Sequence, residues 1–179
     1  MIQLIHRVDD RVEAAFGSLR GNPVADRVFY TASSLGEFGL LWVMLALIRW
    51  LRGRPGDQRA AIRTLLGLGI ESPIVNAGLK TLFARPRPIV EVDHPHPFRR
   101  PLTSSFPSGH ATSSFCAATL LSEDDELGPL YFALASVVAA SRVHTKIHHA
   151  SDVVGGALIG TCFGLIGRRL APLQRKRPS

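Results

Sequence analysis

The sequence predicts an all-α, integral-membrane helical bundle of about five spanning helices, with six as the alternative, preceded by an amphipathic N-terminal helix. The first observation behind this is that the apolar residues of the 179-residue chain are gathered into long runs, at a mean hydropathy of +0.15. A run of about 20 such residues is enough for a helix to cross the hydrocarbon core of a bilayer. The second is that arginines gather at the ends of these runs, a pattern typical of membrane helices.

Residues 1–27 are predicted to form the amphipathic start. The segment MIQLIHRVDDRVEAAFG alternates apolar and charged residues. It lacks the uninterrupted apolar core and the small-residue cleavage site of a signal peptide. We therefore expect a helix that is retained and lies in the membrane interface.

Five apolar segments follow, and each is predicted to span the membrane. They cover residues 28–51, 60–83, 107–121, 127–143 and 150–167. The segment 84–106 is rich in proline and is predicted to be a long ordered loop over the site, and residues 168–179 form a basic tail. Because composition shows no break along the chain, residues 1–179 are predicted to form a single domain.

The charge balance has several explanations that the residue pattern separates. A net charge of +7 with a pI near 10.4 suits nucleic acid, an anionic membrane or an anionic substrate. No aromatic platform or recognition helix accompanies the charges, so we expect no nucleic-acid partner. Ten of the 21 Lys and Arg residues lie within 49–63 and 168–177, close to span ends. The positive-inside rule then places these two segments in the cytoplasm and the opposite face outside it.

Small and acidic residues inside the predicted spans carry further expectations. Gly156, Gly160 and Gly164 repeat every four residues, which leaves one helix face bare and lets another helix approach closely. Glu37 and Glu71 are costly within a membrane unless they face a wet cavity or the bundle interior. They are expected either to line the site or to form hydrogen bonds between helices, and the sequence leaves both alternatives open.

Three short segments concentrate charged and titratable residues at the ends of the predicted spans. They are Lys80 with Arg87-Pro88, then Pro107-Ser-Gly-His110, then Ser141-Arg142 with His148 and Asp152. Because consecutive spans alternate in direction, the end of the second span, the start of the third, the end of the fourth and the start of the fifth share one membrane face. The three segments are therefore expected to form one cluster.

The cationic residues of this cluster match a phosphoryl group. Lys80, Arg87 and Arg142 would supply three fixed positive charges for three non-bridging oxygens. Pro107 suits the first position of a helix, so the backbone amides after it and the Ser108 hydroxyl are expected to face the same anion.

The histidines add a route for phosphoryl transfer. His148 and Asp152 lie four residues apart, so the carboxylate can accept a hydrogen bond from one ring nitrogen and raise the basicity of the other. A histidine held in this way can attack phosphorus. His110 can protonate the departing oxygen and later activate water against the phosphohistidine. We expect no metal and no other cofactor, because the cations supply the charge of a divalent ion.

Together, the patterns Lys-x6-Arg-Pro, Pro-Ser-Gly-His and Ser-Arg-x5-His-x3-Asp resemble the three signature motifs of the type 2 phosphatidic acid phosphatase (PAP2) superfamily. The resemblance implies a helical bundle with a phosphohistidine mechanism. The residues that it implies for phosphate binding are Lys80, Arg87, Ser108, Gly109 and Arg142. Soluble acid phosphatases and vanadium haloperoxidases are similar at the same motifs, but the apolar spans favour the membrane lipid phosphatase branch.

The substrate stays open within that branch. A polyprenyl (di)phosphate, a decaprenylphosphoryl sugar phosphate, phosphatidic acid and phosphatidylglycerol phosphate all present a similar terminal phosphate to the cations. The expected partners are therefore a membrane lipid substrate and the bilayer itself. The active site is expected on the extracytoplasmic face of the cell membrane, and the oligomeric state is left open.

Two alternatives use the same residues differently. His144 and His148 are four apart and could form a helical metal pair completed by His110 and Asp152, although nearby cations would repel a divalent ion. A membrane channel or lipid-binding protein without catalytic activity would explain the charges but not the histidine and aspartate spacings.

The proline-rich loop contains further basic residues. Arg85-Pro86 repeats the Arg-Pro pair, but the six-residue gap from Lys80 selects Arg87, so Arg85 is expected at most to contact a headgroup or a residue behind the site. The remaining candidates for headgroup contact are His94, His96, Arg99 and Arg100, and solvated loop residues are the alternative for these.

Overall fold

The computed structural model describes residues 2–89 and 103–173, and over these residues it is helical and contains no strand. The helices are α1 (Ile2–Gly17), α2 (Pro23–Leu35), η1 (Glu37–Gly39), α3 (Leu40–Arg52), α4 (Asp57–Pro73), η2 (Ile74–Leu79), α5 (Lys80–Phe83), α6 (Gly109–Leu121), α7 (Gly128–His144) and α8 (Ala150–Leu170). The all-α prediction is confirmed. That residues 1–179 form one domain stays a prediction.

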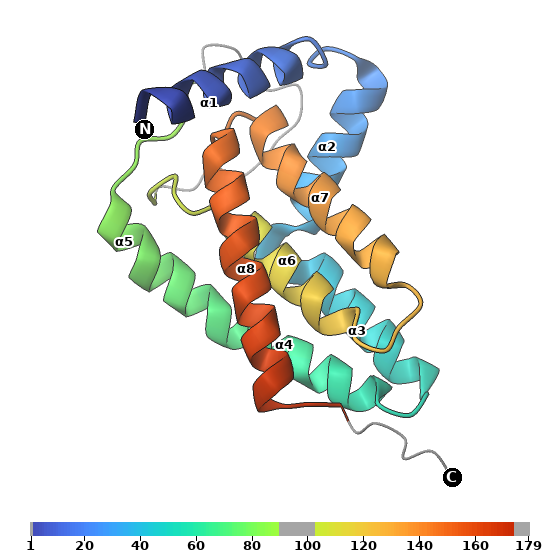
Figure 1. The fold of residues 1–179 in the computed structure, drawn as a ribbon. Coiled ribbons are helices and arrows are strands. Elements are labelled where there is room, and N and C mark those ends of the chain that lie inside the picture. The colour runs from blue at the N-terminus through green and yellow to red at the C-terminus, as the bar shows by residue number, and fades with distance from the viewer. Residues whose placement is uncertain (1, 90–102, 174–179) are drawn as a thin grey trace.

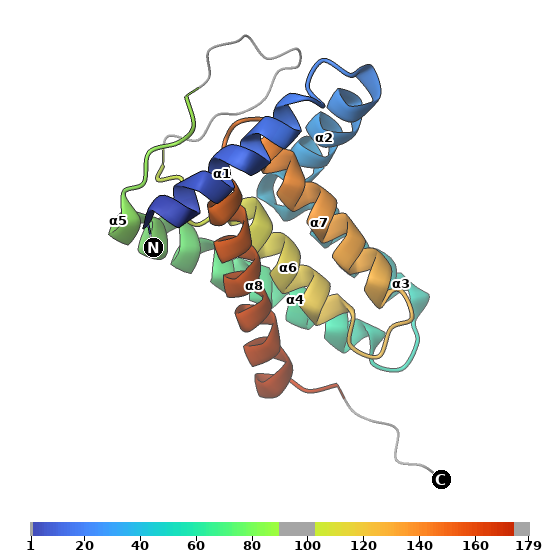
Figure 2. The ribbon, with the colours of Figure 1, turned by 45° about the horizontal axis from the view of Figure 1, so that its top comes forward.

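Helix α6 lies at the centre of the bundle and packs against α8, α7 and α4 (Figure 1). The amphipathic α1 lies across one end of the bundle, over the start of α8 (Figure 2). The loop between α3 and α4 and the end of α8 lie at the opposite end (Figure 1). The predicted spans 107–121, 127–143 and 150–167 correspond to α6, α7 and α8 to within three residues at each end.

The close approach of α8 to α6 depends on the predicted glycine face. A Cβ atom at Gly160 would lie 2.1 Å from the carbonyl oxygen of Thr112, and one at Gly156 would lie 2.6 Å from that of Ser108. Real Cβ atoms do not come so near to backbone, so a side chain here would force the helices apart. The predicted packing role of Gly156, Gly160 and Gly164 is confirmed.

The prediction of one continuous helix over residues 28–51 is wrong. The segment is divided between α2 and α3, which are bent by 63° around η1. Phe38 (φ 52°) and Gly39 (φ 70°) take left-handed conformations that interrupt a helix. Helix α2 also begins earlier than the predicted span, because the Asn22 side chain accepts hydrogen bonds from the backbone amides of Val24 and Ala25.

The second predicted span begins at Asp57 rather than Ala60 and changes its winding towards its end. After Pro73 the chain forms the π-helical turn η2 and then the short α5. A π turn adds a residue to the helical repeat and shifts the face that later side chains occupy. This turn directly precedes Lys80.

Length and composition identify α8 as a helix able to cross a membrane, and the bent pair formed by Pro23–Leu35 and Glu37–Arg52 passes the same test if it is counted as one span. The 13 residues of α6 extend about 20 Å at 1.5 Å per residue. The count of about five spans therefore stays a prediction. Part of the proline-rich loop (90–102), with His94, His96, Arg99 and Arg100, and the last part of the basic tail (174–179) lie outside the described residues.

Arginines at the end of the bundle far from α1 are paired as well as clustered. Arg49 Nε donates to Asp57 at 2.9 Å, and Arg52 Nη2 donates to Asp125 at 2.6 Å. Burial alone would raise the pKa of Asp125, but hydrogen bonds, first from Arg52, lower it to about 2. These residues therefore join α3, α4 and the α6–α7 turn, which the sequence pattern did not indicate.

Candidate active site

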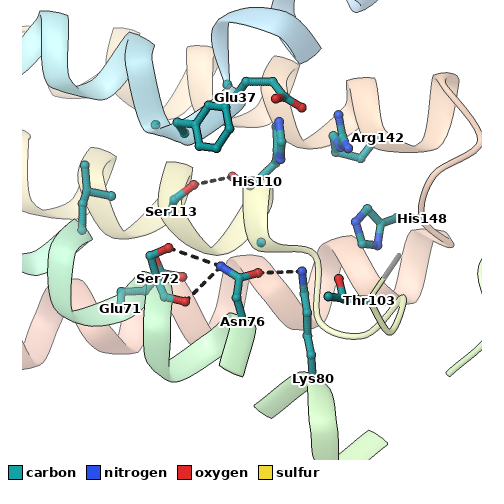
Figure 3. A pocket seen from close by; sticks show the side chains of 15 residues that line it. Glu37, Glu71, Ser72, Asn76, Lys80, Thr103, His110, Ser113, Arg142 and His148 are labelled. Atoms are coloured by element: carbon teal, nitrogen blue, oxygen red, sulfur yellow. Dashed lines mark hydrogen bonds between the residues drawn. The ribbon is translucent and has the colours of Figure 1, made fainter. Parts of the chain in front are cut away.

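A cavity of about 430 Å³ lies between the α2–α3 bend, α4, η2, α6 and the end of α7 (Figure 3). Five of the eight predicted site residues line it, and Arg87, Ser108 and Asp152 lie next to them. The five are Lys80, Gly109, His110, Arg142 and His148. The three sequence segments thus meet in one place, as their spacing predicted.

Lys80 enters the cavity from the side of the π turn (Figure 3). Its Nζ donates a hydrogen bond to Asn76 Oδ1 at 2.7 Å, and Asn76 Nδ2 in turn donates to the carbonyl oxygen of Ser72 at 2.9 Å. The ammonium is therefore held in one direction. The sequence prediction missed Asn76, whose only signal was its position four residues before Lys80.

Arg142 is 1% exposed near the end of α7. Its Nη1 donates to Ser33 Oγ at 2.5 Å, whereas Nε and Nη2 have no hydrogen-bond partner within residues 2–89 and 103–173. Buried donors of a charged group are costly when unpaired. Because Arg142 also lines the cavity, an anion bound there would satisfy them.

His148 lies in the loop between α7 and α8 and is 2% exposed. Its Nε2 lies 3.3 Å from Nη1 of Arg87, on the side of the cations. Its Nδ1 lies 3.7 Å from Oδ2 of Asp152, so the expected hydrogen bond is a longer contact here. Burial lowers the pKa of His148 to about 3, although the Asp152 carboxylate opposes this. The imidazole is therefore neutral near pH 7, which is the form that can attack an electrophile.

Asp152 is fully buried at the start of α8. It accepts hydrogen bonds from Arg85 Nη1 and Ser105 Oγ, both at 2.5 Å, and from the backbone amide of His149 at 2.9 Å. These donors fix the carboxylate beside His148. Arg85 thus contacts a residue behind the cavity, one of the two expectations for it.

Arg87 is fixed by backbone acceptors on two segments. Its Nε donates to the carbonyl oxygen of Thr103 and its Nη1 to that of Ile147, both at 2.9 Å. Lys146, the residue before Ile147, takes a left-handed backbone conformation with a φ of 51°. Arg87 therefore joins the proline-rich loop to the loop that carries His148.

The start of α6 differs from the expectation by two residues. Gly109, rather than Pro107, is the first helical residue, and the Oγ of Ser108 before it accepts a hydrogen bond from the amide of Ala111 at 3.5 Å. The amide of Ser108 donates to the carbonyl oxygen of Asp152 at 3.1 Å. A Cβ at Gly109 would lie 3.5 Å from Lys80 Nζ, so glycine keeps room for a ligand between the helix start and the lysine.

His110 faces the cavity from the first turn of α6, close to Glu37 (Figure 3). Its Nε2 lies 3.2 Å from the carbonyl oxygen of Ser33. Glu37 and the buried Glu71 both line the same cavity. Of the two alternatives for these carboxylates, the structure therefore supports lining of the site.

His144 is not among the residues that line this cavity, and it points away from it. Its Nε2 lies 2.7 Å from Asp26 Oδ1, and its ring stacks on Phe29 at a centroid distance of 4.6 Å. Within the described part of the chain, no group of three or more His, Cys, Asp or Glu side chains is arranged to hold a metal ion. The geometry therefore does not favour a metal pair of His144 and His148.

The sequence of this chain is similar to those of known proteins. The profile of the PAP2 superfamily matches residues 60–176. The chain is 34% identical over 142 residues to the decaprenylphosphoryl-5-phosphoribose phosphatase of Mycobacterium tuberculosis, covering 76% of each chain. It is 33% identical over 119 residues to the Escherichia coli protein YbjG, named as a candidate undecaprenyl-diphosphatase, covering 65% of this chain and only 60% of that one.

Two solved structures share the arrangement of helices. The transmembrane PAP2 type phosphatidylglycerolphosphate phosphatase of Bacillus subtilis superposes with a TM-score of 0.72 at 22% identity, over 97% of this chain and 90% of that one. LpxE of Aquifex aeolicus superposes with a TM-score of 0.65 at 26% identity, over 94% of each chain.

Proposed function

Because the chain belongs to the PAP2 superfamily, we propose that it is an integral-membrane phosphatase that removes phosphate from a lipid through a phosphohistidine at His148. The observation that carries this is the buried Arg142, which lines the same cavity as His148 and His110 and whose Nε and Nη2 have no hydrogen-bond partner in the described part of the chain. A phosphoryl group bound there would satisfy the guanidinium. It would also lie between the two histidines.

The first step transfers the phosphoryl group to the enzyme. Lys80, Arg87 and Arg142 bind its non-bridging oxygens and stabilise the charge that develops on them. Nε2 of His148 attacks phosphorus while the bond from phosphorus to the lipid oxygen breaks. His110 gives its proton to that oxygen. Because Nε2 of His110 lies against the Ser33 carbonyl, Nδ1 is the nitrogen left to exchange the proton.

The second step regenerates the enzyme. His110, now neutral, takes a proton from water, and the water oxygen attacks the phosphohistidine. The bond between phosphorus and Nε2 of His148 breaks, and inorganic phosphate leaves. The Asp152 carboxylate stabilises the positive charge that His148 carries in the intermediate. The three cations perform the charge stabilisation in both steps, so this mechanism requires no metal.

We propose a prenyl-linked phosphate as the substrate class ahead of phosphatidic acid and phosphatidylglycerol phosphate. Two relatives that are 33% and 34% identical to this chain over the aligned residues are named for undecaprenyl diphosphate and for decaprenylphosphoryl-5-phosphoribose. The phosphatidylglycerolphosphate phosphatase is similar at only 22% identity, which supports the fold alone.

We also propose that the cavity opens on the extracytoplasmic face. The arginine-rich loop between α3 and α4 lies at the end of the bundle opposite the α7–α8 loop that carries His148 (Figure 1). The positive-inside rule places the α3–α4 loop in the cytoplasm. Tags at both termini, probed from outside the cell, check this, and a C-terminal tag found outside would contradict it.

The activity is tested by phosphate release in detergent with EDTA present. The substrates are a short-chain prenylphosphoryl pentose phosphate, farnesyl diphosphate and a short-chain phosphatidic acid, each with wild type and His148→Ala. We expect EDTA-resistant release that His148→Ala abolishes, fastest with a prenyl substrate. Release that EDTA stops and a divalent ion restores would favour a metal-dependent hydrolase, and lipid binding without release would favour a non-catalytic protein.

A further inference from the structure

Asp9 is a buried carboxylate on a helix whose other residues are mainly exposed. It lies in the middle of α1, and only 4% of its surface is exposed. It accepts hydrogen bonds from the backbone amide and the hydroxyl of Ser151, both at 2.8 Å. It also accepts one from Arg85 Nη2 at 2.8 Å. The N-terminal helix is thereby attached to the first turn of α8.

Arg85 continues this connection towards the cavity. Its Nη2 binds Asp9, while its Nη1 donates to Asp152 Oδ1 at 2.5 Å and to Ser151 Oγ at 2.8 Å. One guanidinium therefore bridges two buried carboxylates from opposite ends of the chain. The second oxygen of Asp152 is the one that lies 3.7 Å from Nδ1 of His148.

The charges of this chain of contacts depend on each other. Burial alone would raise the pKa of Asp9, but the hydrogen bonds from Ser151 and Arg85 lower it, so Asp9 is ionised near pH 7. With Asp9 ionised, the charge of Arg85 is shared between two carboxylates. Without the negative charge of Asp9, Arg85 would act on Asp152 alone and compete with the imidazolium of His148 for that carboxylate.

We propose that Asp9 is a positioning residue for the His148–Asp152 pair, acting through Arg85 and Ser151 from the N-terminal helix. The inference rests on the proposed function, because His148 must be the group that attacks phosphorus. It gives α1 a role in the reaction that lies beyond contact with the membrane. Asp9 itself is not among the residues that line the cavity.

The first test compares Asp9→Asn with Asp10→Asn, which makes the same change at the exposed neighbouring position of the same helix. Loss of orientation at a reacting group lowers the rate of the chemical step, so kcat for a short-chain prenyl phosphate should fall about tenfold in Asp9→Asn. KM should change less than about twofold, because the phosphate-binding residues are unaltered. Asp10→Asn should behave as wild type. Equal kcat in both variants would contradict the inference.

A double-mutant cycle separates positioning from a general loss of structure. If Asp9 acts through Arg85, then Asp9→Asn should have little further effect in an Arg85→Gln background. Fully additive losses would contradict the connection. A fall in kcat matched by a lower thermal unfolding midpoint in detergent, and by a similar rise in KM, would indicate only a structural role and would also overturn the inference.

A third measurement does not depend on hydrolysis of any lipid. The ¹⁵N ring resonances of His148, assigned with a His148→Gln variant, report its tautomer and its contact with Asp152. They should shift in Asp9→Asn and stay in place in Asp10→Asn. Unchanged resonances would overturn the role of Asp9 whether or not the protein releases phosphate. Shifted resonances in a protein without activity would instead retain the connection and reject the proposed function.

Discussion

Nη1 of Arg87 lies 3.3 Å from Nε2 of His148, while Nδ1 of the same imidazole faces Asp152. The ring thus has a cation on one side and a carboxylate on the other. A phosphoryl group held by the guanidinium would present its phosphorus to Nε2, the nitrogen that is not occupied by the carboxylate. This relationship gives the phosphate-binding and nucleophilic roles that we propose a common geometry.

Arg87→Lys should retain the charge near His148 but lose the backbone hydrogen bonds that fix the guanidinium. We expect kcat/KM for a prenyl phosphate to fall by about 10² to 10³, the usual effect of removing a transition-state donor. Phosphate release from initial rates measures this. Arg27→Lys, at an exposed position of α2, is the control, and an equal effect in both variants would argue against a role for Arg87.

Asn76→Ala should leave the Lys80 ammonium without its 2.7 Å acceptor. A hydrogen bond to a charged group contributes about 1.5–3 kcal/mol. We therefore expect kcat/KM to fall by about tenfold or more. Asn76→Asp keeps an oxygen in place and should retain more activity than Asn76→Ala in the same assay. The opposite order would show that Asn76 does not act through Lys80.

Glu37→Gln should change the discrimination between a monoester and a diphosphate. The carboxylate of Glu37 lines the cavity near His110 and acts electrostatically on Arg142. It would repel the second phosphate of a diphosphate, and at an effective dielectric constant near 20 such an effect is on the order of 1 kcal/mol or more. The ratio of kcat/KM for farnesyl diphosphate to that for a monoester should rise at least about fivefold. Glu126→Gln, at an exposed position, should leave the ratio unchanged.

His148 should not titrate between pH 5 and 8 in the free protein. Burial lowers its pKa to about 3, so the neutral form persists above that pH and is lost only as the pH falls towards 3. A histidine in a peptide titrates near 6.5. The ring ¹⁵N shifts of His148, followed over this pH range, check the prediction. A midpoint near 6.5 would show that the imidazole is accessible to water.

Gly160→Ala should lower stability, because its Cβ would meet the backbone of Thr112 at 2.1 Å. Overpacking of this kind costs about 1–3 kcal/mol. Gly69→Ala in α4 is the control, since its Cβ would meet nothing within 4 Å and alanine favours a helix. Thermal unfolding in detergent should show a lower midpoint for Gly160→Ala and an equal or higher one for Gly69→Ala. A lower midpoint in both would refute the packing argument.

Spacing along the sequence was enough to predict which residues meet at the site. Lys80, Gly109, His110, Arg142 and His148 line one cavity because their segments end or begin helices at the same end of the bundle. The apolar runs and the repeat of glycines similarly predicted α6, α7, α8 and the close contact of α8 with α6. These features depend on residue types and intervals, which the sequence states directly.

Hydrogen-bond partners could not be predicted in this way. Asp152 is held by Arg85 and Ser105, and Arg142 by Ser33, all more than 40 residues away along the chain. Ser33 lies in the last turn of α2, just before the chain bends by 63° where the sequence suggested a continuous helix. Glycine permits such a bend but does not require it, so packing against the other helices had to decide it.

The sequence by itself therefore determined the chemistry that this protein can offer, through three cations, two histidines and a carboxylate at fixed intervals near helix ends. Only the tertiary structure decided how those groups are oriented, including the connection of Asp9 to His148 through Arg85. The physical reason is that helical intervals are local and follow from the backbone repeat. The direction of a buried side chain depends on donors and acceptors that distant segments bring to it.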